Sequence, residues 1–399
     1  MVSQSSSDRS LRHYKLEEKS ANQLLELENE FQTCHSARKW YFTNWAWYRQ
    51  NGGKYLPEDI DAHLCSHIVY GFALLNRETL TIQPHDSWAD LDNHFYERVV
   101  TYRSRGIKVN VAMGGWNDSA GDKYTRLVRT AAARSYFTKN VISFMEKYGF
   151  EGLDLDWEYP VCWQVGCKKG RPDEKEDWIA VMTYDYHGQW DKKTGHVAPM
   201  YDYPGNVENF KVNFSINYWL QMGAERKKLI MGMPMYGQSF TLAQASDHGL
   251  NAPYGGGEAG ETTRARGFLS YYEICAYIQK FGWNVVRDPR GRMGPFAFLR
   301  DQWVSFDDAP MIQHKSEYVK AMSLGGAMIW ALDLDDFKNV CNCESYPLLK
   351  AINRDACHGV VEELHQLWNI PGNCTVYNGA SKNPKFAGGL FELVKFRQY

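Results

Sequence analysis

The sequence has little that would tie the chain to a membrane or to nucleic acid. It contains no apolar run long enough to cross a bilayer. It also has little net charge, because 45 basic residues nearly balance 47 acidic residues and leave a formal charge of -2. A partner of strongly acidic character is therefore not expected. The sequence shows neither a serine–histidine–aspartate triad nor a glycine-rich phosphate-binding loop with the usual spacing. Triad hydrolases and enzymes with such a phosphate loop are therefore not indicated.

The start of the chain lacks the apolar core of a signal peptide. Residues 1–8 are polar and rich in serine. However, nine cysteines and the sequons that begin at Asn117, Asn213 and Asn373 are typical of secreted proteins. We reconcile the two observations by expecting a piece, or an alternative product, of a longer secreted protein, with an extracellular location.

The most informative feature is a row of acids within residues 149–160, GFEGLDLDWEYP. Because side chains alternate across a strand, Asp154, Asp156 and Glu158 are expected to share one face, with apolar residues on the other. Three neighbouring carboxyls repel one another and resist burial, so they do not all ionise at neutral pH. One of them is expected to keep its proton and to act as a general acid.

Two plainer interpretations of the acid row remain open. The row suits the solvated face of a half-exposed antiparallel sheet, although acids rarely recur at every second position of an apolar strand. Clustered carboxylates also bind Mg²⁺ or Ca²⁺, but the spacing of an EF-hand loop is absent here. Neither a metal nor a cofactor is expected.

The acid row resembles the D-x-x-D-x-D-x-E signature of glycoside hydrolase family 18, the chitinases and chitinase-like lectins, and is closest to those of insects and other arthropods. One position departs from the signature, because Glu151 stands where the family usually has aspartate. Other stretches resemble the family's barrel strands: residues 39–45, 67–73, 109–116, 178–185, 229–237 and 326–332. The resemblance implies an α/β fold, the TIM (β/α)8-type barrel, with a small α+β insertion domain at about 241–310.

One unit of that barrel is missing from the sequence. The fourth strand ends near Tyr159 and the sixth begins at Trp178, which leaves only the eighteen residues 160–177 between them. A barrel spends about 30 residues on each strand and helix, so a helix, a strand and another helix do not fit there. We therefore predict that the fifth strand is deleted.

The whole chain is expected to divide into three parts. Residues 1–36 form a polar extension with an amphipathic helix at 12–33, residues 37–357 form the barrel, and residues 358–399 form a loop-rich tail. Residues 206–224 are expected to be helical.

Several cysteines point to disulfides. The resemblance implies a bridge from Cys275 to Cys341 or Cys343, and zinc binding by Cys341-x-Cys343 is the alternative. Because nine is an odd number, at least one thiol stays unpaired within the chain.

Two further cysteine pairings are less defined. Cys65 resembles half of another family bridge, but its usual partner position is Trp40, which leaves Cys34 as a substitute. Cys162 and Cys167 flank a short loop that they could close.

The resemblance also implies a set of catalytic roles. Glu158 protonates the leaving glycosidic oxygen, and the substrate's 2-acetamido group attacks the anomeric carbon. Asp156 holds the acetamido N–H, Asp154 shares a proton with Asp156, and Tyr184 donates to the acetamido oxygen. A tyrosine buried in the core is the plain alternative for Tyr184.

Further residues resemble sugar contacts of the family. They are Trp330, Trp116, Tyr236, Met182, Asp185 and Trp45. Trp330 resembles the floor under the reacting sugar, for which ordinary core packing is the alternative. Gln238 stands where some relatives carry arginine.

These observations lead to three hypotheses. The first is an endo-type chitinase, expected to be a monomer that acts on chitin or chito-oligosaccharides. The second is a chitin-binding protein without turnover, although the acid Glu158 that such relatives usually lose is intact here. The third is a chain that folds poorly or is inactive, because a barrel without one strand exposes two edges and part of its core.

Overall fold

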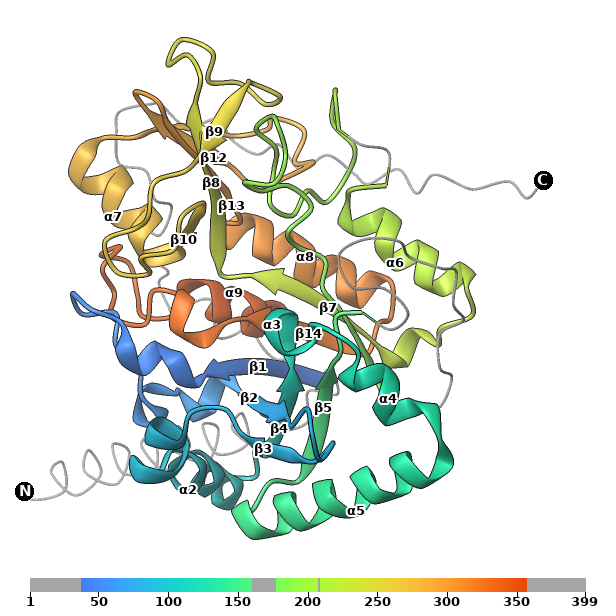
Figure 1. Ribbon diagram of the computed structural model, residues 1–399. Coiled ribbons are helices and arrows are strands. Elements are labelled where there is room, and N and C mark those ends of the chain that lie inside the picture. Colours follow the sequence, from blue (N-terminus) through green and yellow to red (C-terminus); the bar gives the residue numbers. More distant parts are fainter. Residues whose placement is uncertain (1–36, 160–176, 207–208, 357–399) are drawn as a thin grey trace, which may run out of the picture.

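A computed structural model describes residues 37–159, 177–206 and 209–356 of the chain. Its centre is a parallel sheet of seven strands in the order β5-β4-β2-β1-β14-β7-β6, and β3 pairs with the edge of β2 in the antiparallel sense (Figure 1). The strands of this sheet are β1 (Ala37–Thr43), β2 (His67–Leu75), β3 (Ile82–Pro84), β4 (Lys108–Gly114), β5 (Gly152–Asp156), β6 (Ile179–Val181), β7 (Leu229–Pro234) and β14 (Gly326–Trp330).

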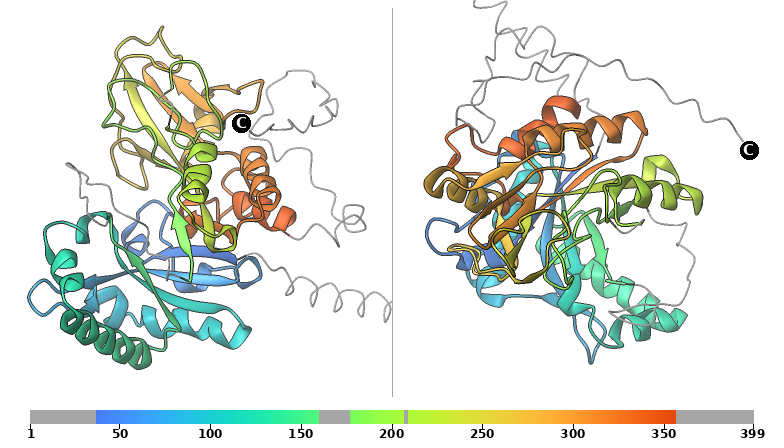
Figure 2. Two further views of the ribbon diagram at one scale, coloured as in Figure 1. Left: turned by 90° about the vertical axis from the view of Figure 1, so that its right-hand side faces the viewer. Right: turned by 90° about the horizontal axis from the view of Figure 1, so that it is seen from above.

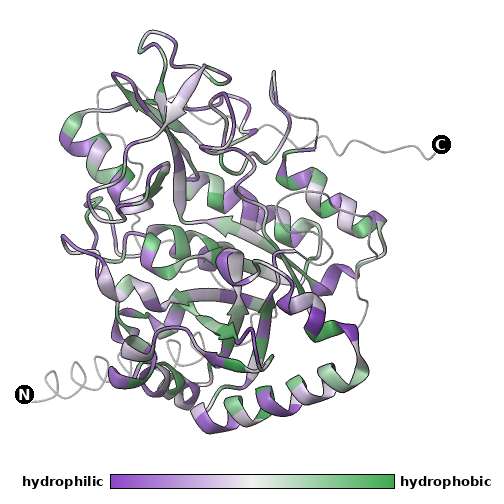
Figure 3. Ribbon diagram, viewed as in Figure 1, coloured by the Kyte–Doolittle hydropathy of each residue, from purple (hydrophilic) through white to green (hydrophobic). Residues whose placement is uncertain are grey.

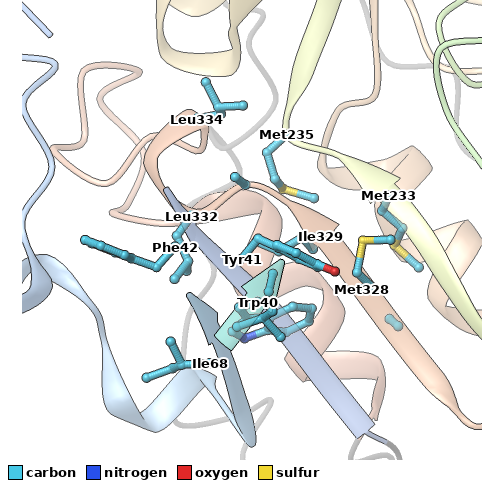
Figure 4. Close-up of a cluster of buried hydrophobic side chains, with 14 of the residues drawn as sticks. Trp40, Tyr41, Phe42, Ile68, Met233, Met235, Met328, Ile329, Leu332 and Leu334 are labelled. Carbon is cyan, nitrogen blue, oxygen red and sulfur yellow. The ribbon is translucent and has the colours of Figure 1, made fainter. Parts of the chain in front are cut away.

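The central strands are apolar on both faces, as parallel strands covered on both sides require. Strand β7 is buried along its whole length, and so is most of β1, β2 and β4. Figure 4 shows Tyr41 and Phe42 leaving β1 in opposite directions, so one faces the barrel interior and the other the surrounding layer. Trp40 also points outward, where its indole N–H donates to the carbonyl oxygen of Leu64 at 2.7 Å.

Helices cover the outside of the sheet. They are α2 (Phe95–Val100), α3 (Gly115–Asp118), α4 (Lys123–Arg129), α5 (Ala131–Tyr148), α6 (Val212–Gln221), α7 (Tyr271–Phe281), α8 (Ala309–Ala321) and α9 (Pro347–Ala356). Helices α2 and α5 lie along one side, and α8 packs with α9 on another (Figure 2). Hydrophilic and hydrophobic residues alternate along α5, as expected for a surface helix (Figure 3). No helix in these ranges is long and apolar enough to cross a membrane.

A second, antiparallel sheet stands beside the barrel (Figure 2). Its strands are β8 (Tyr236–Leu242), β9 (Tyr254–Gly256), β10 (Phe268–Ser270), β11 (Asn284–Val286), β12 (Phe296–Leu299) and β13 (Gln302–Phe306). The order is β10-β8-β13-β12-β11, with β9 beside β8. Helix α7 accompanies this sheet and begins with a capping box between Ser270 and Glu273. The predicted insertion domain is therefore present, but it begins at residue 236 rather than at about 241.

The predicted partial barrel is confirmed as a fold class, and all six predicted strand stretches contain a strand. Strands β5 and β6 end the parallel sheet, each with a single parallel neighbour among the described residues. The structure describes no strand between Asp156 and Ile179. The deletion of the fifth strand stays a prediction, because residues 160–176 lie outside the described ranges.

The helix predicted at 206–224 is shorter than expected. Helix α6 begins at Val212 and ends at Gln221. Several other predictions lie outside the described residues: the extension 1–36 with its helix 12–33, Cys34, Cys162, Cys167, the sequon at Asn373 and the tail 358–399.

One predicted disulfide is present. Cys275 of α7 is bonded to Cys341, with Cα atoms 5.4 Å apart, which rules out zinc binding by the pair Cys341 and Cys343. Cys65 carries a buried free thiol, so the second family bridge is not formed within the described residues.

Replacing Cys275 by serine should lower the free energy of unfolding by about 2–3 kcal/mol, because a bridge across a long loop limits the entropy of the unfolded chain. The two cysteines are 66 residues apart. Urea unfolding of the variant and of Cys65→Ala, a control that breaks no bridge, measures this difference. Equal stabilities of Cys275→Ser and the unchanged protein would contradict it.

Candidate active site

The acid row lies where β5 leaves the parallel sheet. Strand β5 pairs with β4 so that Asp154 lies beside Ala112 and Asp156 beside Gly114. Gly114 has a φ of 126°, and a Cβ added there would lie 2.2 Å from the carbonyl oxygen of Asp156. Only glycine therefore lets β4 approach the row this closely. Asp154 is buried, whereas Asp156 and Glu158 are half-buried.

Glu158 lies beyond the last residue of β5, and Ser119 holds its backbone. The Glu158 N–H donates to Ser119 Oγ at 2.8 Å. The Ser119 hydroxyl in turn donates to the carbonyl oxygen of Asp156 at 3.3 Å. Ser119 therefore fixes the turn that carries the third acid, although sequence reasoning did not single it out.

Tyr41 of β1 links the two aspartates. Its hydroxyl lies 3.1 Å from Asp154 Oδ2 and 3.3 Å from Asp156 Oδ1, as the donor to both. The sequence marked 39–45 as a strand, and alternation along it would have placed Tyr41 on the inner face. The sequence alone did not show that this face meets β5.

The pKa values of all three acids of the row are raised. Burial raises the pKa of Glu158 to about 7, and the negative charge of Asp185 adds to the shift. Burial also raises the pKa of Asp156 well above its usual range, with further contributions from the charges of Asp154 and Glu158. The pKa of Asp154 is raised by burial as well, against the opposing charge of Lys39. All three shifts favour the protonated forms of these acids.

Tyr184 and Asp185 follow β6 and face the acid row. Asp185 adopts a left-handed φ of 56° and accepts hydrogen bonds from the Tyr236 hydroxyl at 2.7 Å and from Gln238 Nε2 at 2.8 Å. The hydroxyl of Tyr184 lies 3.7 Å from the sulfur of Met328. Although Tyr184 is nearly buried, burial and the charges of the nearby acids, with the Asp156 charge the largest of these, raise its pKa. Tyr184 also lines the cavity that contains the acid row.

Trp330 ends β14 within an aromatic cluster. Its ring centroid lies 5.3 Å from that of Tyr41, 6.0 Å from that of Trp45 and 5.8 Å from that of Phe72. The indole is half-buried and lines a cavity. Such a face suits stacking against a sugar ring.

These groups line one cavity of about 1970 Å³. The cavity lining includes every site residue predicted from the sequence: Glu158, Asp156, Asp154, Tyr184, Trp330, Trp116, Tyr236, Met182, Asp185 and Trp45. Trp116 is 46% exposed on one wall. Within the described ranges, no group of three histidine, cysteine or acidic side chains could hold a metal ion.

The cavity lining also includes residues of the outer face of β5. Its lining includes Asp154 on the inner face of β5 together with Leu153 and Leu155 on the outer face. Leu155 is 44% exposed, although the outer face of a barrel strand is normally covered by a helix. Among the described residues, the cavity therefore reaches the outer face at the β5 end of the parallel sheet.

Glu151, the one departure from the signature, lies before the start of β5. Its carboxylate pairs with Lys108 Nζ at 3.1 Å and with Arg103 Nε at 3.5 Å, and it accepts the N–H of Val109 at 3.1 Å. The departure therefore lies at the opposite end of the strand from Glu158.

Comparison with known families finds one that spans the barrel. The model for glycosyl hydrolases family 18 matches in two segments, residues 39–176 and 171–335. The two segments meet within the stretch where the sequence predicts a deletion.

Individual proteins agree with this match. The chain is 65% identical over 359 residues to a probable chitinase 10 of Drosophila melanogaster, covering 79% of this chain but only 16% of that protein. It is 34% identical to chitotriosidase-1 of Mus musculus, covering 79% and 77% of the two chains. Among solved structures, catalytic domain 2 of a Group II chitinase from Ostrinia furnacalis is 50% identical with a TM-score of 0.78, covering 81% of this chain and 96% of that one. A mutant of that domain has been solved in complex with (NAG)5, a chito-oligosaccharide.

Proposed function

The chain belongs to glycosyl hydrolases family 18, and on this premise we propose that it is an endo-type chitinase that hydrolyses β-1,4 linkages between N-acetylglucosamine units. The observation that carries the proposal is the position of Glu158. Its carboxyl, with a pKa raised to about 7, lines the same cavity as Trp330 and the two aspartates. The chito-oligosaccharide complex of the Ostrinia domain supports the same class of substrate.

The proposed reaction uses the substrate's own acetamido group as nucleophile. Glu158 gives its proton to the glycosidic oxygen as the bond to the anomeric carbon breaks. The acetamido oxygen, held by the Tyr184 hydroxyl, bonds to that carbon and forms an oxazolinium ion. Asp156 accepts the acetamido N–H and stabilises the positive charge, while Asp154 shares its proton. Water then opens the ring and gives a proton back to Glu158, with net retention.

Endo-type cleavage is favoured by the way the cavity extends past the acid row. Trp116 lines it after the end of β4, and Met182 and Tyr236 line it after the end of β6 and at the start of β8. Sugar units on both sides of the cleaved bond would therefore have protein to contact. Products from a chitohexaose test this point, because internal cleavage yields several oligomer lengths at early times and terminal cleavage yields one.

We propose an extracellular location and a monomeric barrel unit at 37–357, with chitin or chito-oligosaccharides as the partner. The disulfide between Cys275 and Cys341 supports an oxidising compartment. Because the chain spans only 16% of the Drosophila relative, this proposal concerns the catalytic unit alone.

The pH profile of the reaction should follow the proton on Glu158. Its pKa is raised to about 7, and the protonated carboxyl is the active acid. The value of kcat/KM should therefore fall about tenfold per unit above pH 7. Initial rates with a fluorogenic chitotrioside between pH 4 and 9 measure this (about three points per unit suffices). A rate that rises from pH 7 to 8 would contradict the assignment.

A second candidate is a weakly active or inactive chitin-binding variant. The observation in its favour is the exposure of Leu155 on the outer face of β5. Strand β5 is an edge of the parallel sheet among the described residues, and a closed barrel has no edge. Hydrolysis of the fluorogenic chitotrioside, binding to chitin beads and a thermal melt of the purified chain separate the candidates. Turnover would support the chitinase, and binding without turnover would support the inactive variant. The absence of a cooperative melt would show that the chain does not fold stably, as the open edge of the barrel predicts.

A further inference from the structure

Lys39 is a charged residue in the interior of the barrel. It lies two residues before Tyr41 on β1, so both side chains point to the same inner face. The residue is fully buried, and its neighbours in register are His67 of β2 and Met328 of β14. Lys39 therefore occupies the layer directly below the one from which Tyr41 reaches the aspartates.

The ammonium of Lys39 has no hydrogen-bond acceptor within the described part of the chain. It lies against the face of the Trp178 indole, a cation–π contact. The ring of His67 meets the same indole with centroids 6.1 Å apart. Trp178 lines the cavity, whereas Lys39 does not, so the indole separates the amine from the open space.

A buried cation without a hydrogen-bond partner is costly, so a purely structural role would be better served by an apolar side chain. Burial lowers the pKa of Lys39 to about 6, and the negative charges of Asp154 and Asp177 oppose this shift. The charge of Lys39 in turn opposes the rise in the pKa of Asp154. His67 adds no charge in this range, because burial and the charge of Lys39 lower its pKa to about 4.

We propose that Lys39 is a positioning residue for the acid row: its buried ammonium, beneath Asp154, lets the Asp154–Asp156 pair carry a single proton at mildly acidic pH. The proposal rests on the proposed function, in which the pair must be singly protonated for Asp156 to face a positive oxazolinium ion. Without the cation, two neighbouring buried carboxyls would both hold protons to higher pH, and Asp156 would meet the intermediate as a neutral group.

Lys39→Met tests this, because methionine has nearly the same length and no charge. The direct readout is the titration of the carboxyl carbons of Asp154 and Asp156 by NMR, assigned with Asp154→Asn and Asp156→Asn. Removing the cation should raise the midpoint of the first ionisation of the pair by about one pH unit or more. Lys108→Met, which removes an exposed cation paired with Glu151, should leave the midpoint unchanged.

Lys39→Gln gives a second neutral variant if methionine does not pack, and it should shift the midpoint in the same direction. The acidic limb of the kcat/KM profile should move with the NMR midpoint. If a folded Lys39→Met or Lys39→Gln protein showed the same ionisation midpoint of the Asp154–Asp156 pair as the unchanged protein, the proposal would be overturned. Lys39 would then have only a structural role. Because the NMR titration needs no turnover, a shifted midpoint in an inactive chain would reject the chitinase function and keep the role of Lys39. Turnover with an unshifted midpoint would support the chitinase function and reject the proposed role of Lys39.

Discussion

Replacing Glu158 by glutamine should lower kcat/KM for a chito-oligosaccharide by about 10²–10⁴-fold, the usual contribution of a general acid. Glutamine has nearly the same shape, and the backbone N–H of residue 158 keeps its bond to Ser119 Oγ. The amide, however, has no acidic proton to give to the leaving oxygen. The loss should appear in kcat, while binding of the oligosaccharide, measured by calorimetry, should change little.

Glu151→Gln is a matched control for that variant. The same substitution is made before the opposite end of β5, where the carboxylate pairs with Lys108 and Arg103. Removing such a partly exposed ion pair costs about 0–1 kcal/mol of stability, and kcat/KM should stay within about twofold because no contact with substrate is lost. Similar losses in both variants, or full activity of Glu158→Gln, would show that the acid lies elsewhere.

Replacing Asp156 by asparagine should lower kcat by about 10²–10³-fold, since a neutral amide no longer stabilises the positive charge that forms next to it. The Tyr41 hydroxyl, 3.3 Å from Asp156 Oδ1, can still donate to the amide oxygen. The fold should therefore persist, and KM should change much less than kcat.

Asp122→Asn serves as the control for the Asp156 variant. Asp122 is exposed at the start of α4 and pairs with Arg126 at 3.3 Å, so its loss should leave kcat unchanged. Equal kcat values for Asp156→Asn and the unchanged protein would contradict the role given to Asp156, and a fall confined to KM would reduce that role to ground-state binding.

The sequence predicts the residues of the site better than the contacts between them. The alternation of side chains along a single strand is enough to place Asp154 and Asp156 on one face. The apolar stretches predict the positions of β1, β4 and β14 in the sequence without knowledge of their neighbours. The contacts of Tyr41 depend instead on the register of β1 against the rest of the barrel. Such a register is set by many distant residues and not by any local pattern.

The geometry of single residues could not be predicted from the sequence either. Glu158 was expected on the strand, but it lies beyond it on a turn held by Ser119. The left-handed backbone of Asp185 is stabilised by donors that come from the second sheet. The apolar character of the outer face of β5 can be predicted from the sequence, but the exposure of Leu155 depends on which elements pack against that face.

The claim that the substrate's acetamido group is the nucleophile is tested most directly by the anomeric form of the first product. Proton NMR of a chito-oligosaccharide digest, recorded before mutarotation, gives this form. The account predicts that the β-anomer appears first, because two displacements at the anomeric carbon retain its configuration. Early formation of the α-anomer would mean that water attacks directly, and it would contradict the mechanism assigned to Glu158 and Asp156.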